Sequence, residues 1–170
     1  MPRSEKATAG FGRIEYLKQD IKTGKGKSLS EVQKLRPEDF LDNHSYGWSW
    51  ALCQFLDGHP RHRKTFRALG KVLTSSQFVA LSQRYFDAQS PGLAFEWGMF
   101  SQGLSYGYDL DHAAMVGLEI KPTAVTATGR TFELATNRGW QSAGIRVKKG
   151  STYNITATGR FTLAQKPKPW

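Results

Sequence analysis

The stretch Tyr46–Leu56, YGWSWALCQFL, decides the fold that we expect for this chain. Nearly every residue in it is apolar, and Trp48 and Trp50 stand two positions apart. It is too short to cross a bilayer, which takes about 20 apolar residues. It is long enough for a central helix that is buried on most sides. Cys53 lies within it, so we expect its thiol to be buried as a small hydrophobic group.

Apolar residues recur at helical spacing on both sides of this stretch, which predicts further helices around it. Ser28 and Glu31 have the spacing of a capping box, Pro37 opens a turn through Leu41, and Ser45 is the expected N-cap of the central helix. Ser90-Pro91 is a typical helix start, so two separate helices are expected between residues 75 and 104. The expected helices are 12–22, 29–35, 46–56, 62–73, one with its apolar face at Phe78, Leu81, Tyr85 and Phe86, and one with its apolar face at Leu93, Trp97, Phe100 and Leu104.

The pattern changes after about Asp111, where Thr, Val, Ile and Gly become frequent and apolar residues alternate with polar ones. This alternation is typical of strands, and we expect them around Phe132/Leu134, Ile145–Val147, Tyr153/Ile155/Ala157 and Phe161/Leu163. The pentapeptide TATGR occurs twice, at 126–130 and 156–160, and Lys149-Gly150 is an expected turn. The predicted fold class is therefore α+β. An all-α helical subdomain at residues 11–111 is followed by a small, incomplete antiparallel β-sandwich module at 118–170.

Composition limits the functional classes without choosing one. The chain has 170 residues, 39% of them hydrophobic, which argues against global disorder. Its formal net charge of +10 is compatible with an anionic partner such as nucleic acid, an anionic membrane or an acidic glycan, and does not choose among them. A single cysteine allows no disulfide within the chain, and no signal peptide or transmembrane segment is visible. The cell compartment stays unassigned.

Four short motifs suggest chemistry, and each also has a simpler structural interpretation. Gly26-Lys27-Ser28 resembles the end of a phosphate-binding loop, but the glycine required five positions earlier is Ile21, so a basic linker is expected. Ser105 lies in a G-x-S-x-G pattern, yet a helix rather than a strand precedes it, and a frayed helix end is expected.

The other two motifs could bind cations. His59 and His62 are three residues apart, but no third ligand is evident in the sequence, and we expect a solvated helix start. Asp109, Asp111 and His112 could hold a cation through oxygen ligands, or one of the aspartates could cap a turn. H-E-x-x-H is absent, so the chain contains no complete zinc-hydrolase site.

Two segments resemble known families. Tyr46, Trp50, Phe55 and Leu56, then Phe95, Phe100 and 104–109, resemble the helical C-terminal half of a planctomycete family of gluzincin-like, zinc-metallopeptidase-like proteins of unknown function. Gly139-Trp140-Gln141, Gly144-Ile145, Lys149-Gly150 and Gly159-Arg160 are similar to the start of a β-sandwich module distantly like galactose-binding lectins. That family's metal ligands and the module's distal loops have no counterpart in this sequence, so neither a catalytic nor a metal-ligating residue can be carried over.

The resemblance implies a non-catalytic fragment of a metallopeptidase-like protein: a helical scaffold plus a carbohydrate-binding-like β module, with no cofactor of its own. Its partners would be upstream and downstream parts of a longer chain, whose zinc site lies elsewhere. Two alternatives stay open: a basic helical protein that binds an anionic polymer, and a carbohydrate-binding module with a helical adaptor. For the last, Trp140 is the candidate ligand-binding residue, although a tryptophan buried in the sandwich is the simpler expectation.

Overall fold

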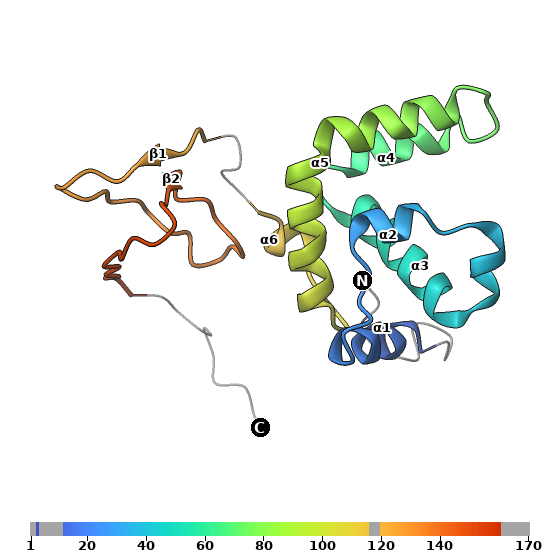
Figure 1. Cartoon of the computed structure of the whole chain (residues 1–170), viewed down its shortest axis with the longest axis horizontal. Helices are drawn as coiled ribbons and strands as arrows, with labels where there is room; N and C mark the ends of the chain where they lie inside the picture. Colours follow the sequence, from blue (N-terminus) through green and yellow to red (C-terminus); the bar gives the residue numbers. More distant parts are fainter. Residues whose placement is uncertain (1–2, 4–11, 116–119, 161–170) are drawn as a thin grey trace. The chain divides into compact units, whose positions relative to one another are not determined.

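The computed structural model describes residue 3 and residues 12–115 and 120–160, without the side chains of residues 88–91. The chain divides into two compact units, Met1–Met115 and Val116–Trp170 (Figure 1). The first unit is helical, and the second contains the one strand pair found among the described residues. The strand expected around Phe161 and Leu163 lies outside the described residues. None of the described helices has both the length and the apolar character that crossing a membrane requires.

Helix α3 (Asn43–Gly58) is the centre of the helical unit, as the sequence predicts. Its buried face carries Trp48, Ala51, Phe55 and Leu56, which the neighbouring helices cover. The other face, with Tyr46 and Cys53, is exposed, so the expectation of a buried Cys53 is wrong. The reason is helical geometry, because Cys53 is two residues from both Ala51 and Phe55 and therefore points away from the buried face that carries them.

The N-terminal cap of α3 is Asp42 rather than the expected Ser45. The Ser45 backbone N–H donates to Asp42 Oδ2 at 2.9 Å, which places the start of the helix one turn earlier. An aspartate is an equally good cap, and the apolar pattern alone does not distinguish the two.

Shorter helices surround α3: α1 (Arg13–Lys22), α2 (Leu29–Gln33), the 3₁₀ helix η2 (Pro37–Leu41), α4 (Arg63–Gly70) and α6 (Leu110–Ala113). The predicted capping box is confirmed, since Ser28 accepts from the Glu31 N–H and Glu31 accepts from the Ser28 N–H. A buried group of hydrogen bonds joins α1 to α3. Asp20 accepts from Trp48 Nε1 at 2.8 Å and lies 2.8 Å from His44 Nδ1.

Residues 78–103 form one helix, α5 (Phe78–Gly103). The prediction of two separate helices in this range is therefore wrong. A proline within a helix removes one backbone N–H donor, and this commonly bends a helix without always ending it. Figure 1 shows the result, because α5 has two arms that run in different directions. The first arm lies beside α4, and the second packs Leu93, Trp97 and Phe100 into the core.

The second unit has much less regular structure than expected. Strands β1 (Thr123–Ala124) and β2 (Ile145–Arg146) are two residues long and pair in parallel, and an antiparallel sandwich is not formed within residues 120–160. Most side chains in this range are exposed, so no apolar layer exists for a second sheet to cover. The Lys149-Gly150 turn is confirmed, with the Ser151 N–H donating to the Lys148 carbonyl at 3.2 Å.

Candidate functional site

His59 and His62 are buried, so the expected solvated helix start is wrong. Helix α3 ends at Gly58, and Pro60 prevents its continuation because proline has no N–H to donate. The chain turns through residues 59–62 into α4, and the His62 N–H donates to the His59 carbonyl at 3.1 Å. This turn points both imidazole rings into the unit, where they lie next to each other and beside Phe55.

Glu96 of α5 supplies the third polar group, which sequence reasoning missed. Its Oε2 lies 2.8 Å from His62 Nε2, and its Oε1 lies 3.2 Å from His59 Nε2 and 3.0 Å from Arg61 Nη2. The carboxylate and both imidazoles are almost completely buried, whereas 37% of the Arg61 side chain is exposed. We call these four residues, with Tyr85, the Glu96 cluster.

The hydrogen-bond partners fix where the protons lie on His62. A carboxylate at neutral pH only accepts, so His62 Nε2 must carry the proton that it directs at Glu96. A neutral His62 then has a lone pair on Nδ1, and the Tyr85 hydroxyl, 2.9 Å away, donates to it. Burial and the negative charge of Glu96 raise the pKa of Tyr85 to about 12, which keeps this phenol protonated.

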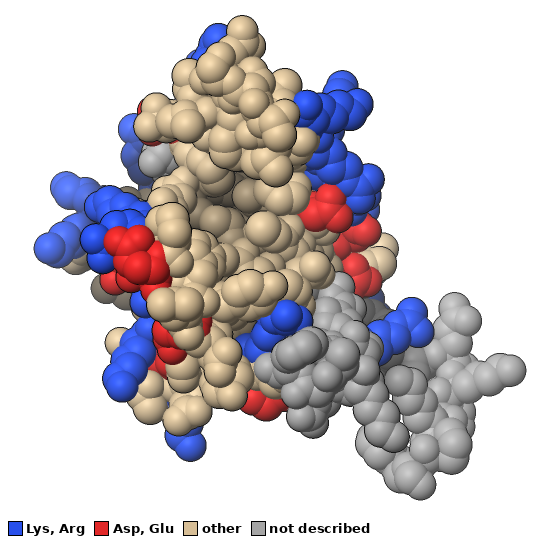
Figure 2. Space-filling model, turned by 90° about the vertical axis from the view of Figure 1, so that its right-hand side faces the viewer, with Lys and Arg blue, Asp and Glu red and all other residues tan. Residues whose placement is uncertain are grey.

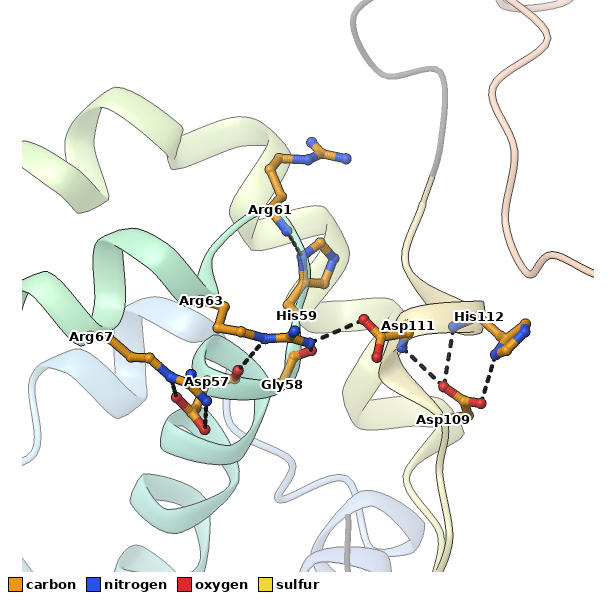
Figure 3. Close-up of polar contacts among 9 residues, drawn as sticks. All are labelled: Asp57, Gly58, His59, Arg61, Arg63, Arg67, Asp109, Asp111 and His112. Carbon is orange, nitrogen blue, oxygen red and sulfur yellow. Dashed lines mark hydrogen bonds and ion pairs between the residues drawn. The ribbon is translucent and has the colours of Figure 1, made fainter.

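His59 has the same proton arrangement. Its Nδ1 accepts the backbone N–H of Arg61 at 3.2 Å (Figure 3), so the proton of a neutral ring must be on Nε2. That nitrogen faces Glu96 Oε1 at 3.2 Å but lies off the direction of a hydrogen bond, and neither atom has another hydrogen-bond partner. The contact is therefore a charge–dipole contact that a small ring rotation would convert into a hydrogen bond.

Burial by itself would raise the pKa of Glu96, but hydrogen bonding to His59 and His62 and the electrostatic effects of His59 and Arg61 outweigh it and lower the pKa to about 2. Glu96 is thus ionised at neutral pH. The positive charge of Arg61 lies 3.0 Å from Glu96 Oε1, and both imidazole rings face the same carboxylate.

His59, His62 and Glu96 could also be considered as metal ligands, because one ligand atom of each lies within 4.8 Å of the others. Within this cluster, two buried atoms have no hydrogen bond, His59 Nε2 and Glu96 Oε1. A metal ion would bind to these two atoms. Two observations oppose a metal. A metal on His59 Nε2 would move the ring proton to Nδ1, where it would face the Arg61 N–H, whereas metal-bound histidines normally donate from that atom. The Arg61 guanidinium also occupies the approach to Oε1. The hydrogen bonds therefore fit an ion pair better than a metal centre.

One signal in the sequence could have identified Glu96. It lies within the apolar stripe of Leu93, Trp97 and Phe100, where a carboxylate is unexpected at a core-facing position. A buried carboxylate needs a cationic or N–H partner, and the nearby sequence HPRHR offers several. Periodicity alone does not show that residues 59–62 and residue 96 meet.

The Asp109, Asp111 and His112 cluster is a helix start, which confirms the capping interpretation for Asp109. Its Oδ1 accepts the backbone N–H groups of Asp111 and His112, at 3.1 and 3.2 Å, and its Oδ2 lies 2.7 Å from His112 Nδ1 (Figure 3). Asp111 pairs with Arg63 at 3.0 Å instead of joining them. Protein donors thus contact the oxygens that a cation would need.

Ser105 follows the end of α5 in a loop, as expected, and no strand precedes it in the described chain. A groove of about 470 Å³ lies between α5 and the loop at residues 24–30. Trp48, Trp97 and Leu29 contribute to its walls, and Lys27 is the one charged residue in its described lining. Without a paired acid and base, this groove offers room for a small apolar group but no catalytic arrangement.

Trp140 is exposed, with 55% of its surface accessible, so the expectation of a buried sandwich tryptophan is wrong. The loop that carries it is closed at its base by Gln141. The Gln141 side chain donates to the Ala135 carbonyl and accepts the Ala135 N–H, both at 2.9 Å. The indole is therefore presented to solvent from a fastened loop.

Comparisons with protein-family models, with curated proteins and with solved structures found no match for this chain.

Proposed function

We propose that the helical unit is a non-catalytic structural scaffold within a longer metallopeptidase-like protein, followed by a carbohydrate-binding-like module. The state of its buried carboxylates supports this proposal. Asp20 and Glu96, which are the buried acidic residues among those described, both face protein donors and are closed off from solvent. A general acid or base must reach its substrate, whereas these groups join helices to one another.

In this proposal the Glu96 cluster holds the helices of the scaffold together. It connects the turn between α3 and α4 to both arms of α5, through Tyr85 on the first arm and Glu96 on the second. The resemblance of the helical segments to the region that follows the zinc site in gluzincin-like proteins suggests what the scaffold supports. An antiparallel sandwich would be completed by strands of the longer chain.

Sequencing the source DNA on both sides of the reading frame tests this proposal. We expect the frame to continue upstream into an H-E-x-x-H helix and downstream into further alternating strands. The present chain, with zinc added, should cleave no peptide substrate. Stop codons close to both ends of the frame, or zinc-dependent cleavage by this chain alone, would contradict the proposal.

A second candidate function is carbohydrate binding by the second unit, and the exposure of Trp140 favours it. Exposed aromatic rings on fastened loops offer an apolar platform for the face of a sugar ring. Titration with galactose, followed by calorimetry, should show binding that Trp140→Ala weakens at least ~10-fold. Phe132→Ala, which removes another exposed aromatic ring of the same unit, is the matched control. Equal effects of the two substitutions would argue against a specific sugar site.

A further inference from the structure

Helix α4, the turn at residues 71–77 and the first arm of α5 up to Phe86 form a helical hairpin. Figure 1 shows α4 and this arm side by side, extending away from the remaining helices of the unit. None of the residues of α4 is fully buried, so the hairpin contributes little to the main core beyond Phe66, Tyr85 and Phe86.

The hairpin has an unusual charge distribution. No Asp or Glu occurs between Asp57 and Asp87, whereas the same segment contains six Lys and Arg residues. Three of these form ion pairs with acidic groups outside the segment: Arg61 with Glu96, Arg63 with Asp111, and Arg67 with Asp57. Lys64, Lys71 and Arg84 are the other three, and they form no ion pair with the described residues.

Apolar side chains are exposed at the end of the same hairpin. Leu73, in the turn, is 61% exposed, and Val79, at the start of α5, is 60% exposed. Leu81 lies two residues after Val79 and is 38% exposed. In Figure 2, which faces the end of the hairpin, most of the upper surface is neither basic nor acidic, and Lys and Arg atoms lie on both sides of it together with fewer Asp or Glu atoms.

We propose that this hairpin binds an anionic lipid surface, with Leu73 and Val79 inserted at the membrane interface and Lys64, Lys71 and Arg84 against the lipid headgroups. Basic residues beside an apolar, helical edge are the combination by which peripheral proteins bind such membranes. Leu73 and Val79 are exposed at the turn end of the hairpin, so a bilayer interface can receive them without a shaped partner surface. The positive charge of Lys64, Lys71 and Arg84, which form no ion pair with the described residues, would attract an anionic surface.

Co-sedimentation of the full chain with vesicles tests the proposal. Vesicles of phosphatidylcholine with phosphatidylserine should bind the chain, and vesicles of phosphatidylcholine alone should not. Lys64→Glu combined with Lys71→Glu should weaken binding at least ~25-fold, about fivefold for each lysine. Lys18→Glu combined with Lys25→Glu changes the net charge equally at exposed positions outside the hairpin, and it should retain most of the binding.

A separate pair of variants tests how much the exposed apolar side chains contribute to vesicle binding. Leu73→Ser should weaken vesicle binding about fivefold, because an exposed leucine loses its burial in the interface. Leu41→Ser, at a 93% exposed leucine of η2, is the matched control and should bind normally. All six substituted sites in these variants are exposed, so the fold of the unit should be unaffected.

Three results would overturn the proposal. Absence of binding to anionic vesicles would leave a protein partner as the occupant of the hairpin. Equal loss in the two charge-reversed variants would mean that only the net charge matters. Binding to double-stranded DNA as strong as to vesicles, without an effect of Leu73→Ser, would indicate an anionic polymer.

Discussion

Replacing Glu96 by glutamine is the most informative perturbation of the helical unit. Glutamine has nearly the same shape but no charge, so the substitution leaves the guanidinium of Arg61 and the N–H groups of His59 and His62 without their common acceptor. A glutamine oxygen can accept from one of these donors, while its NH₂ group would face another donor.

The size of the effect follows from the pKa of Glu96. The pKa falls from 4.5 to about 2, which corresponds to about 3 kcal/mol of stabilisation of the ionised form. Removing one partner of a buried ion pair costs about 3–5 kcal/mol in general, and the partial exposure of Arg61 places the expected loss at the lower end. We therefore expect Glu96→Gln to lower the free energy of unfolding by about 3 kcal/mol.

Urea unfolding followed by the fluorescence of the buried Trp48 and Trp97 measures this loss. Glu38→Gln is the matched control, because Glu38 pairs with Arg36 at 3.2 Å on an exposed surface and should change stability by less than about 0.5 kcal/mol. If the two substitutions cost the same, the Glu96 cluster does not hold the helices together. A zinc-dependent rise in the stability of the unsubstituted chain that Glu96→Gln abolishes would instead favour a metal at this site.

Further predictions concern pH, packing and thiol access. Stability should fall as pH drops from about 4.5 toward 2, because the lowered pKa of Glu96 stabilises the fold only while the carboxylate is ionised; acid titration of Glu96→Gln should show a smaller fall. Gly58→Ala should cost about 1–3 kcal/mol in urea unfolding, since its Cβ would overlap the Cδ1 of buried Leu110, whereas Gly70→Ala meets no atom and should be neutral or slightly stabilising. Cys53 should react with a thiol reagent in the folded chain, and faster as pH rises, because partial burial raises the pKa of its thiol; protection until unfolding would contradict its exposed position.

The sequence alone determined the local structure of the helical unit. The spacing of Trp48, Phe55 and the neighbouring apolar residues predicts α3, because one helical face must be removed from water. Ser28 with Glu31 predicts the start of α2, because the groups that satisfy its first N–H donors are three residues apart in the chain. Such signals act over one or two helical turns, so they can be recognised without knowledge of the fold.

The predictions from sequence were wrong where a structural element depends on packing or hydrogen bonding with residues far away in the chain. Pro91 is a typical helix start, yet packing of the second arm against the core keeps α5 continuous through it. Alternation predicted strands after Asp111, but strands form only when another strand supplies the hydrogen bonds, and within residues 120–160 only β1 and β2 do so.

The Glu96 cluster shows the same limit for the candidate site. His59, Arg61 and His62 are neighbours in the sequence, and their types indicate only a polar, basic turn. Glu96 lies 34 residues beyond His62, and the packing of α5 against α3 decides that its carboxylate meets them in a buried position. Burial is a property of the assembled helices, and it converts an ordinary glutamate into an ionised group with a pKa of about 2, whose loss the fold should not tolerate.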